Sequence, residues 1–169
     1  MTAQIGDRIL IDNKEYTLAC EPLSSYLYDN KVEKLFTAVN TACYRGYCAT
    51  WKVVNDKIYL IDIESPSQIR SKTGSDSGES ISAMQKLFPG QTEVFAIWVN
   101  GTLIIQFGEL LKYIHMGYES ICETNIYLKF ENGVMIEEKT IKKLLRNNEE
   151  RRTMFTITKL SNEFQSPII

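Results

Sequence analysis

The stretch Ile126-Tyr127-Leu128-Lys129-Phe130-Glu131-Asn132-Gly133-Val134-Met135-Ile136 has the form of a β-hairpin. Apolar and aromatic residues flank an Asn-Gly dipeptide, which supplies the positive φ angles that a two-residue hairpin turn requires. A second such dipeptide, Asn100-Gly101, separates the apolar run Val94–Val99 from Thr102–Phe107 in the same way. We therefore expect two antiparallel hairpins. Because Val94–Val99 has no polar position, it is expected to be a central strand covered on both faces.

The same pattern occurs twice nearer the N-terminus, with Asp and Asn in the turns. Ile9–Leu18 turns at Asp12-Asn13, and Trp51–Ile63 turns at Asn55-Asp56. The spacings between the four segments are uneven, so we interpret them as ordinary hairpins of one sheet system rather than as repeats of a solenoid or a propeller.

Two further segments have apolar residues at helical spacing. In the first segment these residues are Ile81, Met84, Leu87 and Phe88. Pro89-Gly90 ends that segment as a helix. The second segment, 137–152, is interrupted by Asn147-Asn148, so a further hairpin turning there is the alternative. The sequence predicts the α+β class: a mainly antiparallel β-sheet built from hairpins, with one or two accessory helices.

The length of 169 residues and a hydrophobic content of 44% fit a single domain, 1–169, with its own core. Seven of the ten residues 71–80 are Ser, Thr or Gly and none is apolar, so we expect a mobile loop there and a flexible C-terminal end at 161–169. Charged residues interrupt the N-terminal stretch, and no apolar run is long enough to cross a bilayer. We therefore expect a cytoplasmic protein without membrane association.

The cysteine and histidine content gives little sign of metal or redox chemistry. There are four cysteines and one histidine, and the Cys43/Cys48 spacing lacks the second matching pair of a zinc site. We expect free, mostly buried thiols and neither a metal nor a cofactor. The sequence has no phosphate-binding glycine loop, dinucleotide fingerprint or nucleophile elbow, so it does not predict an enzyme.

Two aromatic-rich clusters are candidates for binding. In Cys43–Trp51, an arginine flanked by tyrosines is typical of an interface anchor or of a pocket that grips an anion. The alternative is that Arg45 only braces a carboxylate inside the fold. The second cluster, Tyr113–Glu119, contains the only histidine, His115, for which a packing or surface role is the alternative to binding. The candidate partner- or ligand-binding residues are Arg45, Tyr47, Tyr113, His115, Tyr118 and Glu119.

Charge is unevenly distributed along the chain. Residues 1–138 contain 12 basic and 18 acidic residues, whereas residues 139–169 contain seven and three. The acidic body favours encounter with a basic protein and disfavours nucleic acid. In the basic segment, Lys and Arg interleave with Glu and no aromatic platform accompanies them, which predicts a solvated face rather than an RNA site.

Several stretches resemble segments of a group of small uncharacterised bacterial β-rich proteins: Cys43–Trp51, Ile58–Leu60, Trp98–Leu103, Gly108–Leu111 and Tyr113–Tyr118. The resemblance covers residues 16–136, and the group provides no catalytic residues to carry over. Proteins of this size and kind also occur as immunity partners of contact-dependent or polymorphic toxins, which suggests the same role here by association.

These observations lead to two hypotheses about function. The first is a non-enzymatic protein-binding protein, most concretely an immunity protein that neutralises a cognate bacterial toxin by occluding its active site. The alternative is a small-molecule or anion-binding module, or an enzyme, with a pocket around Arg45 and His115. That alternative requires the two aromatic clusters to meet in space.

Overall fold

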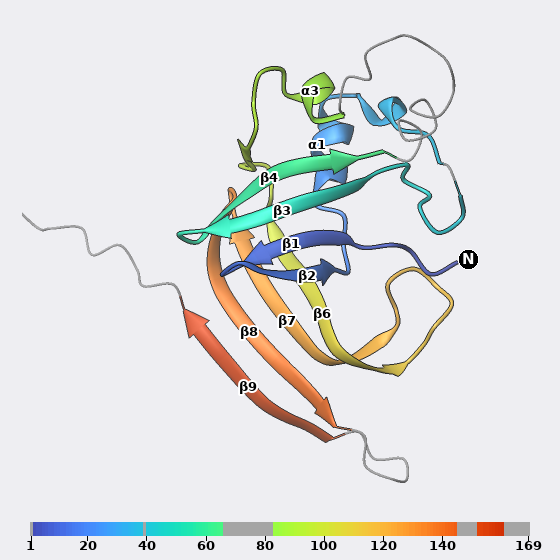
Figure 1. Ribbon diagram of the computed structural model, residues 1–169. Helices are drawn as coiled ribbons and strands as arrows, with labels where there is room; N and C mark the ends of the chain where they lie inside the picture. Colours follow the sequence, from blue (N-terminus) through green and yellow to red (C-terminus); the bar gives the residue numbers. More distant parts are fainter. Residues whose placement is uncertain (1, 39, 66–82, 145–151, 161–169) are drawn as a thin grey trace, which may run out of the picture.

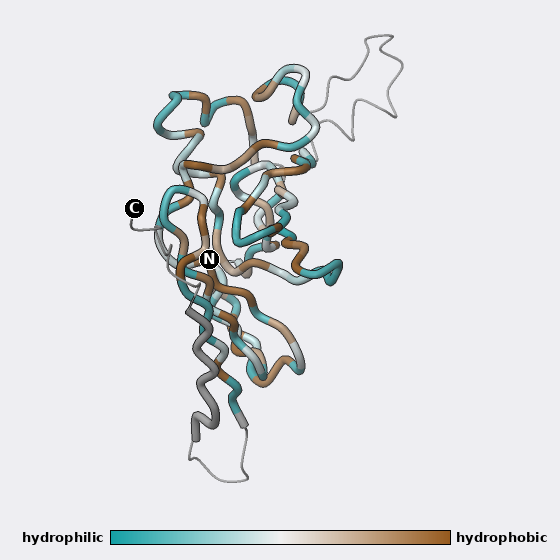
Figure 2. The backbone as a smooth tube through the Cα atoms, turned by 90° about the vertical axis from the view of Figure 1, so that its left-hand side faces the viewer, coloured by the Kyte–Doolittle hydropathy of each residue, from teal (hydrophilic) through white to brown (hydrophobic). Residues whose placement is uncertain are grey.

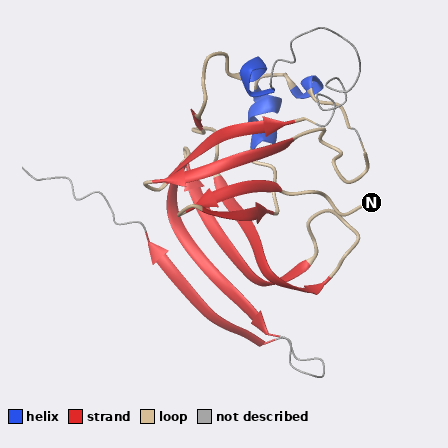
Figure 3. Cartoon of the chain, in the orientation of Figure 1, coloured by secondary structure: helices blue, strands red, loops and turns tan. Residues whose placement is uncertain are grey.

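The computed structural model describes residues 2–38, 40–65, 83–144 and 152–160. Strands make up most of the molecule, and the short helices lie together at one end of it (Figures 1 and 3). In chain order the elements are β1 (Asp7–Ile11), β2 (Lys14–Leu18), α1 (Leu23–Asp29), the 3-10 helix η1 (Glu33–Leu35), β3 (Cys48–Val54), β4 (Lys57–Glu64), α3 (Ala83–Leu87), β5 (Val94–Phe95), β6 (Gly101–Lys112), β7 (Ile121–Glu131), β8 (Val134–Leu144) and β9 (Arg152–Leu160).

The strands form one curved sheet in the order β5-β4-β3-β1-β2-β6-β7-β8-β9. Strands β1 and β3 pair in parallel, and the other neighbouring strands pair antiparallel. The predicted class, a mainly antiparallel β-sheet with accessory helices, is therefore confirmed.

Three of the predicted hairpins are confirmed. They are β1–β2, β3–β4 and β7–β8, which turn at Asp12-Asn13, Asn55-Asp56 and Asn132-Gly133. All six turn residues have φ between 49° and 76°. Two consecutive positive φ angles are what a type I′ turn requires, and its twist matches that of the flanking strands.

The fourth predicted hairpin is wrong, and Val94–Val99 is not a central strand. Only Val94–Phe95 form a strand, which lies at the edge of the sheet and pairs with β4. The chain then turns, with the Val99 N–H donating to the Ala96 carbonyl at 3.0 Å. Ala96 and Val99 are buried in this turn. The apolar run thus reflects burial of a turn, and burial alone does not distinguish a turn from a strand.

The helix predicted over 137–152 is also wrong. The hairpin alternative is the correct one, because β8 and β9 pair antiparallel. Strand β8 pairs antiparallel with both β7 and β9, with Ile141 opposite Asn125 on one side and Thr156 on the other. Pairing on both edges outweighs the helical spacing of a few apolar residues. The turn at Asn147-Asn148 lies outside the described residues, as do the predicted mobile segments 71–80 and 161–169.

The first predicted helix is confirmed as α3, in which Ala83 and Met84 are buried; Ile81 lies outside the described residues. Helix α1 was not predicted. Trp98, in the turn after β5, contacts both helical segments: its ring stacks on Phe88, the residue after α3, at 5.9 Å and 7°, and lies 4.6 Å from the ring of Tyr26 in α1. The Trp98 indole N–H also donates to the Pro22 carbonyl at 3.2 Å.

The curvature of the sheet brings two hairpin turns together. Lys57 at the start of β4 pairs with Val134 at the start of β8, and the Ile58 N–H donates to the Gly133 carbonyl at 3.0 Å. Hydrophobic and hydrophilic residues alternate along much of the backbone, as expected for strands with one buried face (Figure 2). Among the described helices, none has the length and apolar character needed to span a membrane.

Candidate functional site

Three segments that are distant in the sequence meet near the N-terminus: residues 2–6, the loop 40–47 before β3, and the loop 113–120 between β6 and β7 (Figure 1). Ala3 forms a parallel bridge with Gly117. The Gln4 N–H donates to the Gly117 carbonyl and the Ile5 N–H to the Ala42 carbonyl, both at 2.9 Å. The N-terminal segment is therefore held between the two loops by main-chain hydrogen bonds.

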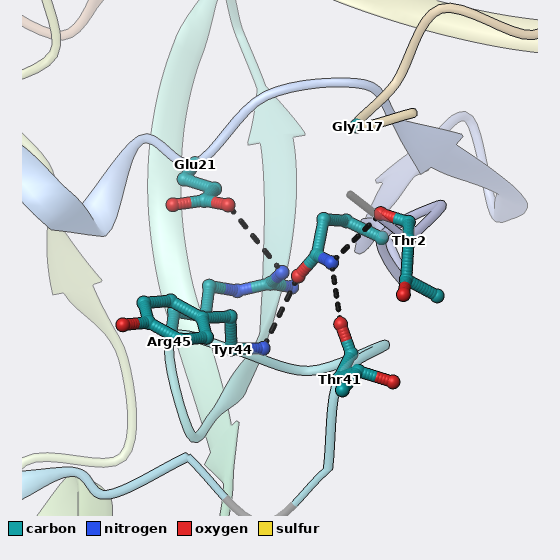
Figure 4. A pocket seen from close by; sticks show the side chains of 7 residues that line it. Thr2, Glu21, Thr41, Tyr44, Arg45 and Gly117 are labelled. Atoms are coloured by element: carbon teal, nitrogen blue, oxygen red, sulfur yellow. Dashed lines mark hydrogen bonds and ion pairs between the residues drawn. The ribbon is translucent and has the colours of Figure 1, made fainter. Parts of the chain in front are cut away.

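A cavity of about 450 Å³ opens where these segments meet (Figure 4). It is lined by Thr2, Gln4, Glu21, Thr41, Tyr44, Arg45 and Gly117. The Gln4 side chain ties its walls together, because Nε2 donates to the carbonyls of Thr41 at 2.7 Å and Thr2 at 3.1 Å. Oε1 of Gln4 accepts from the Tyr44 N–H at 3.1 Å. Both ends of this amide are thus used within the protein.

Arg45 lies behind the cavity with its side chain only 7% exposed. Nη2 donates to Oδ1 of Asp7 at 2.7 Å. Nη1 donates to the Ile5 carbonyl at 2.7 Å and to Oη of Tyr118 at 2.8 Å, and it lies 3.6 Å from Oε1 of Glu21. Both Nη atoms are therefore committed to internal groups, among them the carboxylates of Asp7 and Glu21, whereas the buried Nε has no hydrogen-bond partner.

Asp7 is the buried centre of this network. Its side chain is fully buried at the start of β1, and besides Arg45 it accepts from the Ala49 N–H and from Nε1 of Trp51, both at 3.0 Å. Burial raises the pKa of Asp7 above its ordinary value, while the charge of Arg45 and the hydrogen bonds from Trp51 and Ala49 oppose that rise. Every partner is a donor, which suits a carboxylate.

Glu21 is the member of the network that reaches the solvent, with 31% of its side chain exposed. Oε1 accepts from Oη of Tyr118 at 2.9 Å, and Oε2 accepts from Oγ of Ser24 at 3.2 Å. The hydroxyls of Ser24 and Tyr47 lie 3.1 Å apart. Burial raises the pKa of Tyr47 and Tyr118, so both phenols are neutral at physiological pH.

The structure brings together three of the six sequence-predicted residues. Arg45 contacts Tyr118 although 73 residues separate them, and its guanidinium lies 5.2 Å from the ring centroid of Tyr47. The two aromatic clusters therefore do meet. Of the two interpretations of Arg45, the contacts with Asp7 and Glu21 fit the one in which it braces a carboxylate inside the fold.

The other three predicted residues lie outside this network. Oη of Tyr113 and Nδ1 of His115 are 2.9 Å apart in an exposed part of the loop 113–120, and neither residue lines the cavity. Glu119 donates its N–H to the Met116 carbonyl at 3.1 Å. A binding role for these side chains stays a prediction.

Sequence reasoning missed the residues that complete the site, above all Asp7 and Glu21. A signal for Asp7 was present: it shares a strand face with Ile9 and Ile11 in the period-two pattern of β1. An acidic residue on an inward face calls for a buried cation, and Arg45 was available as one. No comparable pattern in the sequence marks Gln4 or Glu21.

All four cysteines are free, and of these only Cys43 is fully buried. Burial raises the pKa of Cys20 and of Cys48 to about 11, which keeps both thiols protonated at neutral pH. In the described part of the chain, no three His, Cys, Asp or Glu side chains are grouped as metal ligands would be. Comparisons of this chain with protein-family models, curated proteins and solved structures found no match.

Proposed function

We propose that this chain is a non-enzymatic binding protein that engages a protein partner at the face around the cavity. The observation that carries the proposal is the set of apolar side chains exposed at that face: Ile5, Tyr44 and Met116. They belong to the three segments that the main-chain hydrogen bonds hold together. Tyr44, 77% exposed, lines the cavity itself. Exposed aromatic residues on a fixed backbone are typical anchors of protein interfaces.

The charge distribution supports a basic partner. Residues 1–138 contain six more acidic than basic residues, and the cavity face belongs to this part of the chain. Charge complementarity of this kind accelerates encounter and selects among partners. The association rate with the partner should therefore fall as salt is added.

In its most specific form, which rests on the resemblance to small bacterial proteins, the proposal is an immunity protein for a cognate toxin. Tyr44 would enter the toxin's active-site cleft, with Tyr113 of the neighbouring loop contacting its rim. Acidic side chains of the body would pair with basic residues that bind the toxin's substrate. Occlusion of this kind requires no chemistry from the immunity protein.

The size of the cavity favours a second candidate function, a small-molecule-binding module. A volume of about 450 Å³ falls within the range of ligand sites, roughly 300–1,000 Å³. The contacts of Arg45 argue against an anionic ligand, because its charge is already paired with Asp7 and Glu21. A thermal-shift screen with metabolites tests this function, and stabilisation that Tyr44→Ala abolishes would support it.

The test of the main proposal compares two exposed apolar residues. Tyr44→Ala alters the cavity face, whereas Ile97→Ala removes a side chain that is 60% exposed beyond β5. Tagged wild-type protein and both variants are used to capture proteins from lysate of the source cells, with quantitative mass spectrometry. We expect one basic protein to be recovered by wild type and Ile97→Ala, to be lost with Tyr44→Ala, and to be inhibited when bound. Equal recovery by all three baits, or no specific recovery, contradicts the proposal.

A further inference from the structure

The charge balance of the network determines what the cavity can attract. Asp7 and Glu21 are two carboxylates, and Arg45 is the single cation between them. Arg45 pairs with both carboxylates but offsets only one negative charge, and Glu21 is the carboxylate that reaches the cavity, since Asp7 is fully buried. Among the described lining residues, none other than Arg45 and Glu21 carries a charge.

Apart from the hydroxyls of Thr2, Thr41 and Tyr44, which can donate or accept, the hydrogen-bonding groups of the lining are mostly acceptors. Each oxygen of Glu21 accepts one hydrogen bond from a hydroxyl, at 2.9 Å and 3.2 Å, and keeps a further lone-pair position. The carbonyls of Thr2, Thr41 and Gly117 each accept one bond from Gln4 and likewise keep capacity. Nη1 and Nη2 of Arg45 and the side-chain amide of Gln4 already donate to internal partners, and Nε of Arg45, which has no partner, is buried. The lining therefore best fits a ligand that donates several hydrogen bonds.

We propose that the cavity binds the cationic side chain of an arginine or lysine that the protein partner inserts beside Glu21. This inference rests on the proposed function and specifies the anchoring contact. Arginine and lysine combine several N–H donors with an aliphatic stem, so the head can reach Glu21 while the stem lies against Tyr44. A charge-assisted hydrogen bond to a carboxylate is stronger than a neutral one, which would select basic partners.

The proposal can be tested without the partner. Nα-acetyl-arginine amide and Nα-acetyl-lysine amide are titrated into ¹⁵N-labelled full-length protein, and the amide signals of Tyr44 and Gly117 are followed by NMR. Nα-acetyl-citrulline amide is the neutral control with nearly the same shape as the arginine probe. We expect saturable shifts with the two cations, with dissociation constants on the order of 1 mM, and none with citrulline.

Two variants localise the binding. Glu21→Gln keeps an oxygen for Tyr118 but removes the charge, and should weaken binding of the arginine probe by about tenfold or more. Glu131→Gln is the matched control, since it removes one exposed carboxylate at the far end of β7. If Glu21→Gln disturbs the fold, the exposed Tyr44→Ala should weaken binding instead, because it removes a wall of the cavity.

Several results would overturn the inference: no saturable shift with either cation, equal binding of citrulline, equal loss in both glutamine variants, or binding of phosphate at these amides. Tighter binding of putrescine than of both amides would also overturn it, because the natural occupant would then be a free diamine. The probes bypass the partner, so their failure leaves a Tyr44-dependent complex intact. Conversely, loss of the partner in the capture experiment leaves the result with the probes unaffected.

Discussion

Nη2 of Arg45 lies 2.7 Å from Oδ1 of Asp7, and the two side chains are 7% and 0% exposed. This ion pair joins the loop 40–47 to the start of β1. Removing each charge from water costs several kcal/mol, which their attraction and their remaining hydrogen bonds must offset. The pair is therefore important mainly because neither partner is tolerated alone in this position.

Removing the cation from this pair should strongly destabilise the fold. We expect Arg45→Met to lower the free energy of unfolding by about 3–5 kcal/mol, because it leaves Asp7 buried without a counter-ion. Urea denaturation followed by circular dichroism measures the change. The control is Arg8→Met, which breaks an exposed pair with Glu64 and should cost at most about 1 kcal/mol. Similar losses in both variants would contradict the assignment of a buried pair.

The two Asn-Gly dipeptides provide a matched pair of substitutions. Gly101 and Gly133 have φ of 96° and 76°. An alanine at either position would have to adopt a positive φ, which lowers the free energy of unfolding by about 1–2 kcal/mol. At Gly133 a Cβ would in addition lie 2.6 Å from the Ala96 carbonyl, whereas at Gly101 it would meet open space. We therefore expect Gly133→Ala to lose clearly more unfolding free energy than Gly101→Ala in urea titrations. Equal losses would argue against the contact between the β7–β8 turn and the turn at Ala96.

These dipeptides also show where sequence reasoning succeeds and where it stops. Both glycines have the positive φ that Asn-Gly indicates, but the preceding asparagine has it only at Asn132 and not at Asn100. Only Asn132-Gly133 joins two paired strands. Asn100-Gly101 follows a buried turn, because the strand before it pairs with β4 instead of β6. Strand pairing depends on which segments meet in space, and local residue preferences do not specify that.

The same distinction applies to the site. The residue types around Arg45 correctly marked it as more than a surface arginine, but its partners Asp7 and Tyr118 are 38 and 73 residues away. Two interpretations, grip on an anion or support of a carboxylate, were both compatible with the local sequence. The choice between them followed only from the long-range contacts, which also revealed Glu21 as the exposed charge of the cavity.

Trp98 should prove to be the main attachment of the helices to the sheet. We expect Trp98→Ala to cost about 3 kcal/mol or more, because Tyr26 and Phe88 lose their packing partner. Trp98→Phe keeps an aromatic ring and should cost about 1 kcal/mol for the lost hydrogen bond to Pro22, together with some loss of contact area. Tyr28→Ala, an exposed position on α1, serves as the control and should change the unfolding free energy by less than about 0.5 kcal/mol. Thermal and urea denaturation measure the loss of stability in the three variants. Equal losses for Trp98→Ala and Tyr28→Ala would contradict this prediction.

Stability should fall between pH 9 and pH 11. Burial raises the pKa of the Cys20 and Cys48 thiols from 9.0 to about 11, so the unfolded chain loses these protons before the folded protein does. The folded state then binds more protons than the unfolded state, and stability decreases as pH rises through this interval. The upper limit is about 1.4 kcal/mol per pH unit for each fully buried group, and the partly exposed Cys48 contributes less.

Burial also raises the pKa of Tyr47 and Tyr118, which extends the decrease in stability above pH 10 in the same direction. Urea midpoints measured from pH 7 to pH 11 should stay level up to about pH 8.5 and then fall steadily. Because Cys20 is the more buried of the two thiols, Cys20→Ala should make the decline shallower relative to its own midpoint at pH 7. Alkylation with iodoacetamide gives an independent measurement, since a pKa of about 11 predicts slow reaction of Cys20 at pH 8. A midpoint that rises or stays constant up to pH 11 would show that these groups are not buried in the neutral form.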